Sequence, residues 1–299
     1  MKKLDIIKLT KSIKPIGLGG LSIYEITKFF YIGLVEGAIT TRASSLAFNF
    51  FLAFFPSIIV LFTLIPYIPI SGFQETLMEI LINILPPSTS EITFTTLDDI
   101  INNQRGGLLS IGFILALYFS TNGINSLIEA FNASYHISET QSILKQRALS
   151  LMLTIALSIM LFVAISLIIF GKITINYLID YNFIQSNEKI LFNSAKWLIL
   201  ISMLFLVIST IFNLGPSHKK TWKTFSPGAI FATLFIILTS LGFSYYIDNF
   251  AQYNKIYGSI GTLIIILLWM YFNAIILLTG FEIDASIINA KKNKEQQQL

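Results

Sequence analysis

Six long apolar stretches restrict the fold of this chain more than any other feature of its sequence. Each is bounded by polar, Pro or Gly residues. An α-helix needs about 20 apolar residues to cross a bilayer, and a spanning segment must satisfy its own backbone polar groups. The six stretches are Ser44–Ile65, Leu108–Ile128, Leu149–Phe170, Ile190–Phe212, Pro227–Ile247 and Ser259–Gly280. We therefore expect an all-α, polytopic membrane protein built as a six-helix transmembrane bundle.

The composition agrees with a membrane protein and excludes several other classes. Of the 299 residues, 54% are hydrophobic and only 12% are charged, whereas soluble domains carry about 25% charged residues. No segment has the mixed polarity of a soluble domain. The chain contains no Cys, which excludes disulfides, thiol catalysis and thiolate metal sites.

Lys and Arg are distributed unevenly between the two sides that six spans would create. Fifteen of the 20 lie in the N-terminal segment, the second and fourth connecting loops and the tail, and five lie on the opposite side. Cytoplasmic loops carry an excess of Lys and Arg, so both termini are expected in the cytoplasm. The same bias accounts for the formal charge of +4 without a nucleic-acid partner.

Three regions flank or interrupt the transmembrane domain at 43–285. The N-terminal segment, 1–42, contains an amphipathic stretch at 23–35 that favours an interfacial helix. The first external loop, 66–107, has apolar residues at helical spacing before Pro86 and Pro87, which predicts a small helical cap on the extracytoplasmic face. The polar tail, 286–299, is expected to be disordered from Lys291 onward.

A polar stripe in the second span is the main candidate for function. Its members repeat at spacings of four and three, which places them on one helix face. The candidates for lining a pathway are Tyr118, Asn122, Asn125 and Glu129, and Asn132 continues the same spacing. Polar side chains are costly towards lipid and should face the protein interior or a water-filled cavity. The stripe therefore indicates either the lining of a solute or lipid-headgroup pathway, or hydrogen bonding between packed helices.

Further polar positions occur in the first and sixth spans. Asn49 is a second candidate for lining a pathway, and Pro56 beyond it favours a kink in the same helix. Glu282 and Asp284 follow the sixth apolar stretch. We expect them to pair with Lys or Arg, with an ion site at a helix end as the alternative. Pro227 and Gly228 mark the start of the fifth helix.

The sequence contains none of the common signatures of enzymes or cofactor sites. HExxH, the phosphate-binding Walker motif, GxSxG and GxGxxG are all missing. The two histidines, His136 and His218, lie in predicted cytoplasmic loops. We expect no catalytic residues, no metal and no cofactor.

Several motifs in the last third of the chain resemble those of the YihY/BrkB family of bacterial inner-membrane proteins. They are Ser226-Pro227-Gly228-Ala229, Tyr245-Tyr246, Tyr257-Gly258-Ser259-Ile260-Gly261, Leu268-Trp269-Met270-Tyr271 and Leu278-Thr279-Gly280-Phe281-Glu282-Ile283. Upstream, the family's first span resembles Arg42-Ala43-Ser44-Ser45-Leu46-Ala47-Phe48 with Phe55-Pro56, and its segment after the second span resembles Ala130-Phe131-Asn132 with Tyr135. Relatives often have Ala at the position of Phe281 and Leu at that of Phe131. The similarity covers nearly the whole chain in the same order.

The resemblance implies a multi-pass protein of the bacterial plasma membrane with six helices. Members have been named ribonuclease BN, a label regarded as mistaken, and virulence factor BrkB; roles in transport have been suggested, and no catalytic residues are agreed. The leading hypothesis is a transporter or lipid-translocating protein without its own ATPase, with membrane lipids as partners and a lipid or small solute as substrate. The alternative is a non-transporting envelope scaffold that docks partners through the cap between 73 and 104. A ribonuclease is the least favoured reading.

Overall fold

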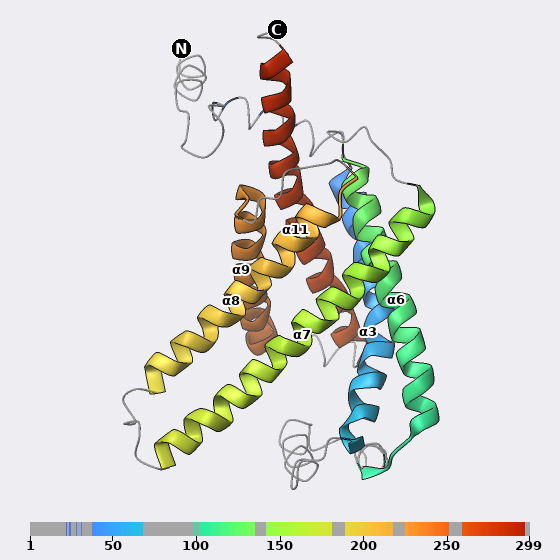
Figure 1. Ribbon diagram of the computed structural model, residues 1–299, viewed down its shortest axis with the longest axis vertical. Helices are drawn as coiled ribbons and strands as arrows, with labels where there is room; N and C mark the ends of the chain where they lie inside the picture. Colours follow the sequence, from blue (N-terminus) through green and yellow to red (C-terminus); the bar gives the residue numbers. More distant parts are fainter. Residues whose placement is uncertain are drawn as a thin grey trace. The chain divides into compact units, whose positions relative to one another are not determined.

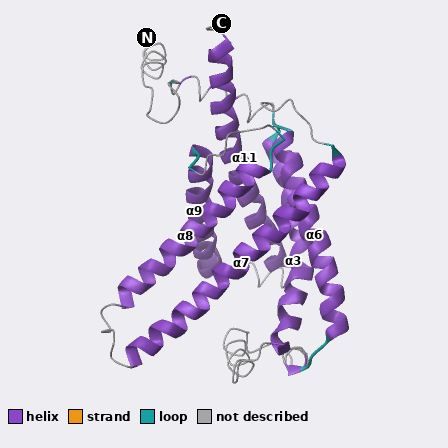
Figure 2. Ribbon diagram, viewed as in Figure 1, coloured by secondary structure: helices purple, strands orange, loops and turns teal. Residues whose placement is uncertain are grey.

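All secondary structure in the described part of the computed structural model is helical (Figures 1 and 2). The described residues are 38–67, 102–134, 142–180, 189–217, 225–250 and 259–296, with isolated positions at 22, 24, 28, 31 and 99. In chain order the elements are α3 (Ile39–Leu64), the 3-10 turn η1 (Ile65–Tyr67), α6 (Gly106–Asn132), α7 (Ile143–Asp180), α8 (Lys189–Leu214), α9 (Pro227–Phe250) and α11 (Ser259–Gln296). The predicted interfacial helix at 23–35 and most of the predicted cap at 66–107 lie outside the described residues.

Among the described residues, six helices are long and apolar enough to cross a membrane, which confirms the predicted fold class. The candidate spans are Ile39–Tyr67, Gly106–Asn132, Ile143–Ala164, Trp197–Leu214, Pro227–Ile247 and Leu263–Ala290. The helices α7 and α11 have 38 residues each, or about 57 Å at the α-helical rise. Since the hydrocarbon core is about 30 Å thick, these two helices extend well beyond one bilayer crossing.

The C-terminal tail differs from the prediction. Disorder is expected from Lys291, but α11 continues to Gln296. Lys, Glu and Gln are good helix formers, and extending an existing helix is easier than starting one. The prediction of disorder was therefore wrong for residues 291–296, where polar composition accompanies a continued helix.

The chain divides into two compact units, and the smaller comprises residues 48–123. It contains most of α3, including Pro56, and the first part of α6. Two glycines of α6 lie close to α3: a Cβ at Gly123 would be 2.9 Å from the ring of Phe50, and one at Gly112 would be 3.0 Å from Ile59. Small residues at these positions allow the two helices to approach closely.

The larger unit comprises residues 1–47 and 124–299 and contains the core. Within it α7 packs against α8, α8 against α9, and α9 most extensively against α11 (Figure 1). The largest fully buried apolar side chains that the structure describes all belong to this unit: Phe131, Phe212, Leu46, Leu127, Ile128, Leu153, Ile208 and Leu278. The core therefore gathers around the start of α3, the end of α6 and the second half of α11.

Candidate functional site

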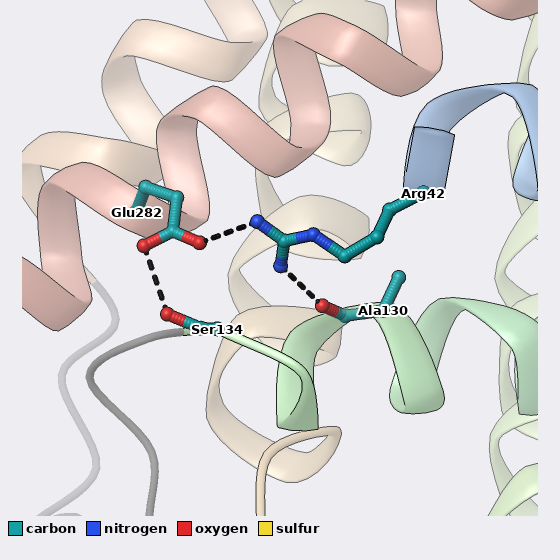
Figure 3. A network of polar contacts seen from close by, with 4 residues as sticks. All are labelled: Arg42, Ala130, Ser134 and Glu282. Atoms are coloured by element: carbon teal, nitrogen blue, oxygen red, sulfur yellow. Dashed lines mark hydrogen bonds and ion pairs between the residues drawn. The ribbon is translucent and has the colours of Figure 1, made fainter. Parts of the chain in front are cut away.

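A buried ion pair in the larger unit joins the first and the last of the six spanning helices. Arg42 lies in the first turn of α3, and Glu282 lies past the midpoint of α11. Nη2 of Arg42 is 2.8 Å from Oε1 of Glu282, and the two side chains are 10% and 0% exposed (Figure 3). Removing two charges from water costs several kcal/mol per ion, and their attraction offsets this only when further hydrogen bonds satisfy both groups.

The second oxygen of Glu282 is satisfied from the chain that follows α6. The hydroxyl of Ser134 donates to Oε2 of Glu282 at 2.8 Å (Figure 3). Ser134 is buried, and its own amide donates to the carbonyl of Phe131 at 3.0 Å. This turn directs the hydroxyl inward, so each carboxylate oxygen of Glu282 has one partner.

Arg42 also binds the C-terminal end of α6. Nη1 of Arg42 donates to the carbonyl of Ala130 at 2.6 Å (Figure 3), and α6 ends at Asn132. The last four carbonyls of an α-helix have no partner within the helix, and they carry the partial negative charge of its dipole. The guanidinium therefore satisfies a helix end and a carboxylate together. We call Arg42, Ala130, Ser134 and Glu282 the ion-pair cluster.

Three phenylalanine rings pack together next to the ion-pair cluster, since Phe131 follows Ala130 and Phe281 precedes Glu282 in the chain. Phe131 stacks on Phe281 with ring centroids 4.1 Å apart. Phe212 of α8 meets both rings edge-on, at 5.6 and 5.8 Å. All three side chains are buried. Such water-poor surroundings strengthen satisfied polar contacts and raise the penalty for an unpaired charge.

Asp284 contacts the start of α9. Its Oδ1 accepts a hydrogen bond from the backbone N–H of Gly228 at 2.9 Å. Pro227 occupies the first helical position, as predicted, and Ser226 caps the helix by accepting from the amide of Ala229 at 3.2 Å. A carboxylate at a helix N-terminus is stabilised by the helix dipole, so Asp284 supplies a matching charge from another helix.

The backbones of α9 and α11 touch at the same place. A Cβ at Gly228 would lie 2.0 Å from the carbonyl oxygen of Gly280, and one at Gly280 would lie 2.7 Å from that of Gly228. Neither position can accept a side chain without moving a helix. The two glycines therefore allow the helices to pack closely at this point.

The end of α6 also holds the chain that leaves α8. The side-chain oxygen of Asn132 accepts a hydrogen bond from the amide of Ser217 at 2.9 Å. Together with the contact between Phe131 and Phe212, this bond fixes the end of α8 against the end of α6. The last turn of α6 thus contacts segments from α3, α8 and α11.

Part of the predicted polar stripe forms a second polar cluster with α7. Asn125 is buried and donates to Oε1 of Glu129 at 2.6 Å. Its side-chain oxygen accepts from Nε2 of Gln146 at 3.1 Å and from the hydroxyl of Ser150 at 3.3 Å. Gln146 also donates to Glu129 at 3.3 Å. We call Asn125, Glu129, Gln146 and Ser150 the amide cluster, and its bonds are those expected of packed helices.

The five predicted pathway residues do not all fall in one described cluster. Asn125 and Glu129 belong to the larger unit, whereas Asn49, Tyr118 and Asn122 belong to the smaller one. Tyr118 is 61% exposed, Glu129 is exposed, and Asn49 and Asn122 are half-buried. A pathway lined by these residues stays a prediction.

The pairing of Arg42 with Glu282 confirms the expectation that Glu282 meets a basic residue, but the sequence did not identify that residue. Asp284 accepts a hydrogen bond from a backbone N–H of α9, and its pairing with a Lys or Arg stays a prediction. One signal pointed to the pair: Arg42 and Glu282 are opposite charges beside the first and sixth apolar stretches, at the same predicted membrane face.

The chemistry available to the ion-pair cluster is that of holding helices together. Its charged groups are a guanidinium and a carboxylate that neutralise one another. Within the described ranges, no group of three or more His, Cys, Asp or Glu could hold a metal ion. The described contacts of these charges join α3, α11 and the end of α6.

Comparison with known proteins places nearly the whole chain within one family. The family model of virulence factor BrkB matches residues 31–299, a range that contains both polar clusters. The ribonuclease-like protein YfkH of Bacillus subtilis (strain 168) is 32% identical over 254 residues, covering 84% of this chain and 91% of that protein. A UPF0761 membrane protein of Haemophilus influenzae (strain 86-028NP) is 24% identical over 281 residues, covering 92% of this chain and 100% of the relative. No solved structure matches this chain.

Proposed function

We propose that this chain, which belongs to the virulence factor BrkB family, moves a lipid or a small solute across the bacterial inner membrane without an ATPase of its own. Six candidate spans and relatives described as membrane proteins support its residence in a bilayer. The distribution of Lys and Arg supports cytoplasmic termini. In that orientation the start of α3 and the end of α6, and with them the ion-pair cluster, belong to the cytoplasmic end.

The observation that carries the proposal is the complete burial of Glu282 against Arg42. Ionisable residues within membrane helices are costly, and by default they mark pathways, relays or moving parts. Stability alone does not call for such a pair, because apolar residues of similar volume often serve as well or better. A charged contact where α3, α6 and α11 meet suits a protein whose helices rearrange during a transport cycle.

One observation favours the alternative of a non-transporting scaffold. Asn125, the central residue of the predicted stripe, is engaged by Gln146 and Ser150 as in ordinary helix packing. A scaffold would dock its partners through the cap between 73 and 104, most of which lies outside the described residues. The two functions differ in whether the purified protein alone moves anything across a bilayer.

The test is reconstitution of the purified full-length protein into liposomes without ATP. One assay follows fluorescent tail-labelled phospholipids of the inner leaflet as they become accessible to a membrane-impermeant reductant. The second follows release of trapped small solutes. Empty liposomes made with the same detergent are the control, and RNA added to the same preparation tests the ribonuclease reading.

We expect at least one flux to exceed that of empty liposomes by about tenfold, a difference of about 1.4 kcal/mol in the barrier, with RNA left intact. If neither lipid nor solute moves at any protein-to-lipid ratio, although the protein elutes as a folded species, transport is refuted. The scaffold then becomes the leading function. If the added RNA is cleaved, and this activity copurifies with the folded protein, the ribonuclease hypothesis becomes the leading one.

A further inference from the structure

We infer that the contact between Arg42 and Glu282 is a latch, a single releasable contact that holds the start of α3 against α11. The inference concerns regulation of the proposed site. Only the purpose of opening rests on the proposed function. Opening itself can be measured without any transported substrate.

When the latch opens, each charged side chain keeps one hydrogen-bond partner. Arg42 and Glu282 share one contact, at 2.8 Å, instead of the two parallel bonds of a bidentate arginine–carboxylate pair. If it breaks, Glu282 keeps the hydroxyl of Ser134 and Arg42 keeps the carbonyl of Ala130. Each charged group thus keeps one polar partner when the contact breaks, and the water that opening admits limits the remaining cost of separating the charges.

The contact between α9 and α11 has the opposite character. Gly228 and Gly280 meet backbone to backbone, and Asp284 bonds the amide of Gly228 beside them. Such closely packed backbones are held by dense contact along both helices. By contrast, the polar link between α11 and the start of α3 that the described residues show is the single contact between Glu282 and Arg42.

Backbone strain lies within one turn of the latch. Ala38 has a φ of 46°, a left-handed conformation that is costly for a residue with a Cβ. The amide of Arg42 donates to the carbonyl of Ala38 at 3.1 Å. The chain therefore enters α3 in an unfavourable conformation while the latch is closed, and opening can relieve it.

Opening would admit water to the residues around Arg42. Ala43 is the next residue along α3 and is 0% exposed, while Ala274 of α11, two turns before Glu282, is 2% exposed. Both are small and buried, and the chain has no native Cys. A single Cys at Ala43 therefore reports on the latch, and one at Ala274 reports on general loosening of the protein.

The experiment measures labelling of Ala43→Cys and Ala274→Cys by a membrane-impermeant maleimide in nanodiscs. Each is placed in the wild-type background and in the Arg42→Gln/Glu282→Gln background, which removes both charges together. We expect Ala43→Cys to label faster than Ala274→Cys in the wild type. In the neutral background we expect a further acceleration of about tenfold at Ala43→Cys alone, as a shifted population requires.

Two results would overturn the latch. Equal, slow labelling at both positions in the wild type would show that the contact stays closed. This result can be obtained even if the neutral variant does not fold. Equal acceleration at both positions in the neutral background would show that the pair only stabilises the fold. A further variant, Ala38→Gly, removes the strain of the closed state and should slow labelling of Ala43→Cys; faster labelling would contradict the strain argument.

The latch and the proposed function fail separately. If labelling is as expected but the protein moves no lipid or solute, the latch is supported and transport is refuted. If the protein moves lipid or solute but Ala43→Cys stays protected from the maleimide, transport is supported and the latch is refuted. If both hold, bridging Arg42→Cys and Glu282→Cys with a reducible cross-linker should stop the flux, and reduction should restore it.

Discussion

The ion-pair cluster and the amide cluster both lie in the larger unit and both use the last turns of α6, yet they differ in sequence separation, charge and burial. The first joins residues 240 positions apart through two opposite charges that are almost wholly buried. The second joins helices adjacent in sequence through residues 17 to 25 positions apart, using amide and hydroxyl groups and the exposed carboxylate of Glu129. Burial and charge, and not polarity alone, are therefore the features that set the candidate functional site apart from ordinary hydrogen bonding between packed membrane helices.

The difference should be largest when one charge is left alone. Arg42→Met leaves Glu282 buried with only Ser134 as a partner, and we expect a loss of about 3–5 kcal/mol in the free energy of unfolding. Unfolding in mixed micelles, followed by circular dichroism, measures it. Lys145→Met, an exposed charge at the start of α7, is the matched control and should change little. A loss below about 1 kcal/mol for Arg42→Met would place the pair with weak surface salt bridges.

Removing both charges should recover most of that loss. In Arg42→Met/Glu282→Met no charge is left unpaired, so we expect stability within about 2 kcal/mol of the wild type. The same unfolding assay completes a double-mutant cycle with Glu282→Met. Additive losses in the double variant would mean that the two side chains do not interact in the membrane-embedded protein.

The amide cluster should respond less. Asn125→Leu removes the acceptor for Gln146 and Ser150 and the donor to Glu129. Ser150 keeps its bond to the carbonyl of Gln146, and Gln146 keeps its bond to Glu129. We expect a loss of about 1–2 kcal/mol, the usual cost of disturbing a partly buried hydrogen bond. A loss as large as that of Arg42→Met would erase the distinction between the clusters.

Cysteine labelling sharpens the same comparison. Asn125→Cys should be protected from an impermeant maleimide because its side chain is buried, and Ile124→Cys is the buried neighbour that serves as control. Labelling at Asn125→Cys with Ile124→Cys silent would instead support a water-filled pathway along the stripe.

The smallest effect is expected at Glu129. It is exposed, and Glu129→Gln keeps an oxygen that can accept from Asn125 and Gln146. We expect a change within about 0.5 kcal/mol. A substantial gain or loss in flux with unchanged stability would show that this carboxylate acts in transport, as the sequence pattern allows.

Sequence reasoning identified the spanning helices but could not identify the ion-pair cluster. Apolar runs are local, so Pro227–Ile247 is recognised to the residue. Glu282 was expected to meet a basic residue, but Arg42 is its partner only because the start of α3 lies against α11. Asp284 binds a backbone N–H, for which no side-chain pattern exists.

The polar stripe shows a second limit. Helical spacing correctly places Asn125 and Glu129 together on α6, where they bond to one another. Spacing does not reveal what covers that face, and Asn125 is buried against α7 while Tyr118 is 61% exposed. A periodic pattern therefore predicts a shared face and leaves its surroundings open.

The chain order of the ion-pair cluster has a consequence for biogenesis. Chains emerge from the ribosome N-terminus first, so Arg42 is made first, Ala130 and Ser134 follow, and Glu282 comes after the five earlier candidate spans of the described residues. Until α11 inserts, the guanidinium has no carboxylate partner in this cluster. The last helix therefore completes the charge balance of the first, and a chain truncated before Glu282 would carry an uncompensated Arg42 at the membrane boundary.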